Sequence, residues 1–271
     1  MSIASEMTRN EPKGFLTDTS LCIGCKACEV ACKQWNQLPM DGLAWEATSY
    51  DNTHTLGATT WRHVTFTESP DSGGPGGQTS WMMMSDVCKH CAHAGCLEAC
   101  PTGAIIRTEF ETVVVQQDVC NGCNYCVPAC PYGVIEVNMA PESGDGKAHK
   151  CTLCYDRLTD GLEPACAKAC PTDSIQFGNL ADLKIRARER VNELRDKGLD
   201  AYHYGDAAIG GTGGIGKLGA SFILLDRTER YNLPANPVLP QSRTLPGVLA
   251  MAAGAALLSI GTAWALRGGG K

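Results

Sequence analysis

Sixteen cysteines constrain the folding of this 271-residue chain more than any other feature of its sequence. They fall into four groups of four, and none is left over. A disulfide framework normally joins distant segments, whereas cysteines two or three residues apart direct their sulfurs into one small volume, as a metal site requires. The spacing therefore favours metal or cluster binding over disulfides. The groups are Cys22, Cys25, Cys28 and Cys32; Cys88, Cys91, Cys96 and Cys100; Cys120, Cys123, Cys126 and Cys130; and Cys151, Cys154, Cys166 and Cys170.

The spacing within the groups is typical of cubane iron-sulfur clusters. CNGCNYCVPACP at 120–131 matches the run in which three cysteines bind one cluster and the following Cys-Pro binds its neighbour. Lys33 replaces the proline in the first group, and the second and fourth groups each widen one gap. We therefore predict four [4Fe-4S] clusters. The alternative, a zinc-stapled interaction module, gives no role to the third cysteine or the Cys-Pro step.

The order of the groups along the chain predicts which cysteines share a cluster. The second and third groups are neighbours with Cys-Pro ends, so we expect them to exchange their fourth ligands. The first and fourth groups must then pair around them. The expected quartets are Cys22, Cys25, Cys28 and Cys170; Cys151, Cys154, Cys166 and Cys32; Cys88, Cys91, Cys96 and Cys130; and Cys120, Cys123, Cys126 and Cys100.

Repeated Cys-Pro steps, each running into apolar residues, indicate an α+β fold of two ferredoxin-like units, one nested within the other. Each cysteine group should form a loop leading into a short helix. Residues 104–118 predict two short strands about a polar turn, and KLGASFILLD at 217–226 predicts another strand. Residues 180–198 predict a solvated surface helix. We expect residues 15–81 and 149–180 to form the first ferredoxin-like unit and residues 82–148 to form the second. A C-terminal extension over 181–243 and a transmembrane helix over 244–267 should follow.

Charge and hydropathy indicate which partners the chain can have and whether it can enter a membrane. A formal net charge of -6 and a pI near 5.5 leave no general basic surface for nucleic acid. The uncharged run at 245–266 is long enough to cross a bilayer as one helix, with Arg243 and Arg267 on either side. The amino terminus lacks the basic start and apolar run of a secretory signal. Because the apolar run contains no His to ligate haem, we expect a separate multi-helix membrane partner.

Several other features have more ordinary interpretations. The insertion at 33–87 contains four tryptophans and the flexible SGGPGGQ at 72–78; we expect the tryptophans to pack in its core, with a partner interface as the alternative. The tryptophans are Trp35, Trp45, Trp61 and Trp81. Three histidines near the cysteines, His90, His93 and His149, are expected at the surface or in hydrogen bonds. Gly211, Gly213 and Gly216 match GxGxxG but follow no suitable strand, so a surface loop is favoured over a nucleotide site.

The chain resembles the iron-sulfur beta subunits of membrane-bound, N-type formate dehydrogenases. The resemblance begins with CIGCKACEVACKQWNQLP at 22–39 and continues through all four cysteine groups, YNLPANP at 231–237 and the terminal apolar run. It implies a non-catalytic electron-transfer subunit that takes electrons from a molybdenum or tungsten pterin subunit oxidising formate. A membrane subunit of cytochrome b or quinone-binding type would receive them. The resemblance also implies that the cluster domain faces outward from the cell membrane.

Other families share the four-group pattern. It occurs in the beta subunits of polysulfide, thiosulfate and sulfoxide reductases, which mostly lack a terminal anchor. Some respiratory hydrogenases have an anchored four-cluster subunit, which usually begins with its own export signal. The alternative is therefore that the chain relays electrons in a sulfur-compound reductase or a hydrogenase instead of a formate dehydrogenase.

Overall fold

A mixed four-stranded sheet lies between one long helix and the main core of the protein. The computed structural model describes residues 11–40, 50, 51, 53, 55–69, 80–139, 144–206 and 215–268. In the sheet, β1 (Lys13–Asp18) runs antiparallel to β8 (Ile175–Asn179) and parallel to β10 (Ala220–Leu224), which pairs antiparallel with β9 (Tyr202–Tyr204). All residues of β1 and β10 are buried, so these central strands are covered on both faces.

The helix α6 (Leu180–Asp196) covers one face of this sheet. Leu183, Ala187, Val191 and Leu194 recur at helical spacing and pack with Leu16 and Ile223 of the sheet. The helix expected over 180–198 is therefore confirmed, and only its outer face is solvated. The opposite side of the sheet carries the main core, in which Phe15 packs among buried cysteines and aliphatic side chains.

The other six strands pair in three two-stranded antiparallel hairpins among the described residues. The hairpin of β4 (Ile105–Arg107) and β5 (Val113–Val115) confirms the two strands expected about a polar turn. A shorter one joins β6 (Glu136–Val137) to β7 (Ala148–His149). The hairpin of β2 (Arg62–Ser69) and β3 (Ser80–Val87) lies within the insertion and was not predicted. The expected strand within 217–226 is β10.

Short helices follow the cysteine loops, as expected. They are α1 (Ala27–Asn36), α2 (Gly95–Glu98), α3 (Cys126–Ala129), α4 (Tyr155–Thr159) and α5 (Ala165–Lys168). The helix α1 packs on α5, and α2 packs on α3. The first pair brings together segments more than 100 residues apart, whereas the second pair is local to residues 95–129.

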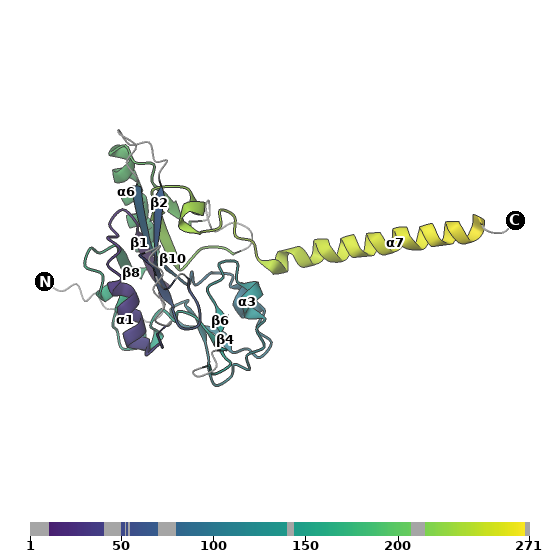
Figure 1. The fold of residues 1–271 in the computed structure, drawn as a ribbon, viewed down its shortest axis with the longest axis horizontal. Coiled ribbons are helices and arrows are strands. Elements are labelled where there is room, and N and C mark those ends of the chain that lie inside the picture. The colour runs from purple at the N-terminus through teal and green to yellow at the C-terminus, as the bar shows by residue number, and fades with distance from the viewer. Residues whose placement is uncertain are drawn as a thin grey trace.

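A long helix projects from the cysteine-containing body (Figure 1). The chain passes through two 3-10 helices, η1 (Thr228–Tyr231) and η2 (Pro240–Arg243), into α7 (Thr244–Gly268). Among the described residues, one helix is long and apolar enough to span a membrane, and it is this one. Its apolar side chains, such as Leu257 and Trp264, are largely exposed, so no other described part of the chain covers them.

The expected core packing of the tryptophans is wrong for two of them. Trp35 is 42% exposed, donates a hydrogen bond to Asp156 (2.8 Å) and stacks on Arg157. Trp81 is 48% exposed and packs on Tyr50. Both rings contact polar or aromatic side chains at the surface. These contacts come from other parts of the fold, so the presence of tryptophans in the sequence does not predict them. Trp61 is partly buried against the core, while Trp45, the glycines at 72–78, Gly211 and Gly213 lie outside the described residues.

Candidate iron-sulfur sites

Site A is a hollow lined by Cys22, Cys25, Cys28 and Cys170. Three of these cysteines come from the loop before α1 and its first turn, and Cys170 follows α5 almost 150 residues later. Apolar side chains including Val64 and Ile175 complete the lining. Cys25 is exposed and Cys28 is buried, so the site lies at the surface with its inner side in the core.

Site B consists of Cys32, Cys151, Cys154 and Cys166, all of which are buried. Burial raises the pKa of the Cys32 thiol, and repulsion from the other three sulfurs raises it further. The packing of α1 on α5 explains this proximity, because Cys32 lies on the first helix and Cys166 on the second. Site B is the most enclosed of the four.

Sites C and D repeat the arrangement within residues 88–130. Site C is a hollow lined by Cys88, Cys91, Cys96 and Cys130. Site D is lined by Cys120, Cys123, Cys126 and Cys100. The contact of α2 with α3 brings the fourth cysteine of each loop to the other site. The structure thus brings the sixteen cysteines together in sites A to D, and all sixteen thiols are free of disulfides. Which cysteines share a cluster stays a prediction.

The same backbone turn recurs in all four loops. The residue immediately before the second cysteine has a left-handed conformation in each: Gly24 (φ 66°), His90 (φ 43°), Gly122 (φ 70°) and Leu153 (φ 58°). This turn folds the loop back on itself, so that its cysteines converge on one centre. At Gly122 the requirement is also steric, because a Cβ atom would lie 2.0 Å from the carbonyl oxygen of Gly146.

Hydrogen bonds reach several of the cysteine sulfurs. The Ala148 N–H donates to Cys120 Sγ (3.4 Å) and the Leu153 N–H donates to Cys151 Sγ (3.3 Å). The Ser85 hydroxyl lies 3.2 Å from Cys28 Sγ. Donors of this kind stabilise thiolate ligands and influence the reduction potential of a cluster.

The chemistry of the donor sets fits a metal cluster. Burial raises the pKa of Cys28 and Cys154 to about 11 and that of Cys96 to about 12. Thiols with such values stay protonated at neutral pH when they are alone, and four of them in one hollow would repel one another as thiolates. Bound iron removes this conflict, because a coordinating thiol loses its proton outright. Residues around each hollow can therefore hold a [4Fe-4S] cluster.

Buried cations lie among the sites, including Lys150, Lys89 and Arg62. Lys150 Nζ donates to the carbonyl oxygens of Val113 and Cys151, and Lys89 pairs with Asp86. Arg62, on β2, is 1% exposed. The two lysines precede or follow cysteines directly, which is a usable sequence signal. Arg62 lies far from every cysteine in sequence and has no such signal.

A buried ion-pair network adjoins site A. Glu29, Asp51 and His63 present ligand atoms within 4.8 Å of one another, as a metal site would. Lys26 Nζ, however, lies 2.9 Å from Asp51 and 3.4 Å from Glu29. This ammonium group supplies the positive charge that the carboxylates need, so the network is structural.

The histidines near the cysteines form hydrogen bonds or lie at the surface, as expected. His90 is buried, and its Nδ1 accepts a hydrogen bond from the Val113 N–H (3.1 Å). His149 pairs with Asp145 (2.9 Å), and His93 is exposed. Each cysteine quartet is complete without them.

Four-cysteine hollows built on ferredoxin-type loops define the class of the protein. The family of the 4Fe-4S dicluster domain matches twice, over residues 21–104 and over residues 79–180. The chain is therefore an iron-sulfur protein with two dicluster domains. Its electron-transfer character follows, because such clusters exchange single electrons.

Curated relatives identify the particular family. The chain is 40% identical to the formate dehydrogenase iron-sulfur subunit of Haemophilus influenzae, over 85% of this chain and 71% of the relative. It is also 40% identical to the formate dehydrogenase-O iron-sulfur subunit of Escherichia coli, over 84% and 72%. The chain belongs to the family of formate dehydrogenase iron-sulfur subunits. A subunit of the anaerobic dimethyl sulfoxide reductase of Escherichia coli is 35% identical, over 63% of this chain and 75% of the relative.

Proposed function

We propose that this chain is the electron-transfer subunit of a formate dehydrogenase and carries four [4Fe-4S] clusters, one in each of sites A to D. The observation that carries the proposal is the grouping of sixteen cysteines into four quartets with crossed fourth ligands. Sites A and B then form the outer ferredoxin-like unit, and sites C and D form the unit nested within it. When bound, each cluster would accept and release one electron with little rearrangement of the protein.

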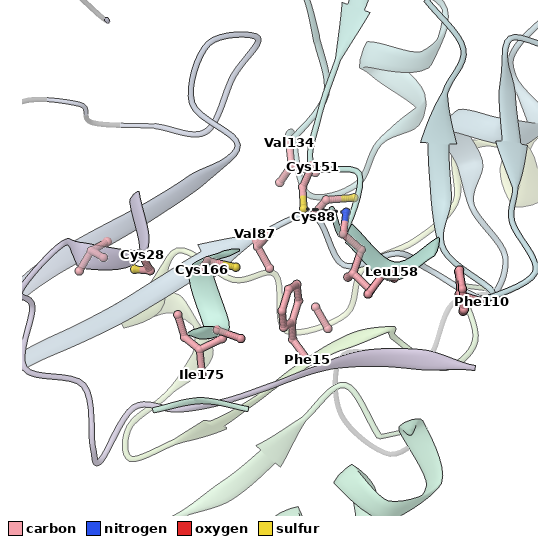
Figure 2. Close-up of a cluster of buried hydrophobic side chains, with 14 residues drawn as sticks. Phe15, Cys28, Val87, Cys88, Phe110, Val134, Cys151, Leu158, Cys166 and Ile175 are labelled. Atoms are coloured by element: carbon pink, nitrogen blue, oxygen red, sulfur yellow. Dashed lines mark hydrogen bonds between the residues drawn. The ribbon is translucent and has the colours of Figure 1, made fainter. Parts of the chain in front are cut away.

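The four sites follow one another through the protein. The sulfur of Cys166 in site B helps to raise the pKa of Cys28 in site A, that of Cys88 in site C helps to raise the pKa of Cys151 in site B, and that of Cys126 in site D helps to raise the pKa of Cys96 in site C. Figure 2 shows Cys28, Cys166, Cys151 and Cys88 in succession across the core. This order supports a single path from A through B and C to D, with Cys25 and Cys123 exposed at its two ends.

The position of α7 gives the path a direction. Leu239, just before this helix, packs close to Gly95, and Gln241 Nε2 donates to the Gly95 carbonyl oxygen (3.2 Å). Because Gly95 lies on α2 between sites C and D, we propose that these sites adjoin the membrane. A multi-helix membrane subunit of cytochrome b or quinone-binding type would accept electrons there. The proposed outward orientation of the cluster domain rests on the family resemblance.

Site A lies at the other end and would face the catalytic partner. Several exposed apolar side chains surround it, including Ile23 in its loop and the packed pair of Tyr50 and Trp81. Exposed apolar surface of this kind is typical of subunit interfaces. The proposed partner is a molybdenum or tungsten pterin subunit that oxidises formate.

The relationship to dimethyl sulfoxide reductase keeps a second catalytic partner open. That relative matches 63% of this chain, whereas the formate dehydrogenase subunits match 84 to 85% at higher identity. The longer match favours formate.

The test uses the intact complex, purified without oxygen in mild detergent. We expect this chain to account for about sixteen iron and sixteen sulfide, four cubanes' worth, beyond any iron that its partner subunits hold. Formate should bleach the visible absorbance of the clusters, whereas hydrogen should not. Zinc without sulfide would refute cluster binding, while reduction by hydrogen, or reoxidation by a sulfoxide without any response to formate, would assign the chain to another complex.

A further inference from the structure

Arg62 is a buried cation between sites A and B. It begins β2, and its side chain is among the largest that are fully buried in the protein. Burial lowers the pKa of an arginine, but here the nearby sulfurs of Cys166 and Cys28, followed by those of Cys151 and Cys32, keep the pKa of Arg62 above its ordinary value. These cysteines belong to both sites, Cys28 to site A and the other three to site B. Arg62 therefore acts electrostatically on both sites.

The hydrogen bonds of this guanidinium group are incomplete. Its Nη1 donates to the Ser85 carbonyl oxygen (3.3 Å) and hydroxyl oxygen (3.0 Å), and the same hydroxyl lies 3.2 Å from Cys28 Sγ. Its Nε and Nη2 have no hydrogen-bond partner among the described residues. A buried, unpaired donor is destabilising, and more so when it is charged. The group is therefore suited to an acceptor that the protein alone does not provide.

The charge of Arg62 has no carboxylate partner among the residues that the structure describes. Within the described part of the chain, no carboxylate forms an ion pair with it, and its flat face lies 4.7 Å from the ring centroid of Phe15. Lys89, by contrast, pairs with Asp86, and Lys150 donates to two carbonyl oxygens. Arg62 differs from both lysines because two of its donor atoms have no hydrogen-bond partner among the described residues, while the sulfurs of sites A and B act on its charge.

We propose that Arg62 is a tuning residue that raises the reduction potentials of the clusters in sites A and B. The inference rests on the proposed function, in which both sites hold clusters. The free N–H groups would donate to cluster or cysteine sulfur, and the fixed positive charge would stabilise the electron that each cluster gains. Hydrogen bonds to sulfur and local charge are the protein's main means of adjusting such potentials. Reduction adds one electron to a cluster and breaks no bond.

The test is a redox titration of the anaerobically purified full-length chain in its complex, followed by electron paramagnetic resonance of the reduced clusters. In Arg62→Gln, two of the four titration waves should move to lower potential. At the wild-type midpoint, the ratio of reduced to oxidised cluster should fall at least tenfold, which corresponds to about 59 mV for a one-electron couple. The other two waves should not move. Arg62→Lys, which keeps the charge, should shift the same two waves by less.

Two further variants separate tuning from general damage. Ser85→Ala removes the hydroxyl that joins Arg62 to Cys28 and should shift a single wave, that of site A. Arg188→Gln removes one positive charge from an exposed ion pair with Asp206 and should shift none. If Arg62→Gln fails to assemble, Arg62→Lys and Ser85→Ala decide by the same criterion.

Unchanged potentials in the Arg62 variants, or an equal shift of all four waves, would overturn the inference. Failure of the proposed function would look different, because the wild-type protein itself would then lack four cluster signals and the matching iron and sulfide.

Discussion

Replacing Gly122 by alanine should open site D far more than the same change at Gly146. Both glycines have a left-handed backbone, with φ of 70° and 68°. An alanine Cβ in that conformation costs about 1 kcal/mol at either position. At Gly146 the added atom meets nothing within 4 Å, whereas at Gly122 it would lie 2.0 Å from the Gly146 carbonyl oxygen. Gly146→Ala is therefore a control that isolates the collision from the backbone strain.

The collision forces the Gly122 and Gly146 loops apart. Ordinary contact begins at 3.4 Å, so the loops must separate by about 1.4 Å, the difference from 2.0 Å. The Gly146 N–H bond to the Asn138 carbonyl (2.9 Å) and the Asn138 N–H bond to Lys147 (2.8 Å) lie in this region. Loss of both adds about 2 kcal/mol. The total is about 3 kcal/mol for Gly122→Ala and about 1 kcal/mol for Gly146→Ala.

The assay adds an iron chelator under anaerobic conditions and follows the visible absorbance of the clusters. The measured quantity is the rate at which the part of this absorbance that belongs to one cluster is lost. If release follows the population of the opened loop, each 1.4 kcal/mol changes the rate about tenfold. Gly122→Ala should then lose the cluster of site D about 100-fold faster than wild type, and Gly146→Ala about five-fold faster. Equal rates in the two variants would refute the steric argument. A wild-type rate in both would refute the argument from the left-handed backbone as well.

Cys100→Ser should alter the spectrum of the same cluster as Cys126→Ser, although Cys100 adjoins the loop of site C in sequence; perturbation of different clusters would refute the crossed ligation. Truncation after residue 243 should release the cluster domain from membranes with its iron intact, because α7 carries no cysteine; loss of iron would make the helix structural for the domain. Burial lowers the pKa of His203 to about 4. The stability that this neutral imidazole contributes is therefore complete above about pH 6.5 and is lost as the pH falls toward 4, by about 1 kcal/mol at pH 5.5. Thermal unfolding at pH 7.5 and 5.5 should show a smaller loss in His203→Phe than in wild type, and parallel losses would contradict this role.

Local patterns predicted local structure well. The cysteine spacing alone indicated the loops and the short helices after them, because the ligand geometry is set within about ten residues. The strands at Ile105–Arg107 and Val113–Val115 were equally predictable, since their apolar residues flank a short turn. The expected quartets rest on the repeated spacing, in which three groups end in Cys-Pro and the first ends in Cys32 followed by Lys33.

Long-range pairing limited the rest of the prediction. The strand Lys13–Asp18 pairs with a strand about 200 residues later, and nothing near it in sequence indicates that partner. The burial of Arg62 depends on the β2–β3 hairpin and on Phe15, three segments that only the fold brings together. The exposure of Trp35 likewise depends on Asp156 and Arg157, which belong to another helix.

The split origin of sites A and B has a consequence for synthesis of the protein. All ligands of sites C and D lie within residues 88–130, so both sites can be completed while the chain is still growing. Cys22 and its neighbours must wait for Cys170, which a ribosome adding about 5–20 residues per second reaches about 7–30 seconds later. If these cysteines bind clusters as proposed, the first four thiols lack their partner ligands during that interval. Assembly of the inner pair of sites should therefore precede that of the outer pair, and a factor that shields the first cysteines would act within this interval.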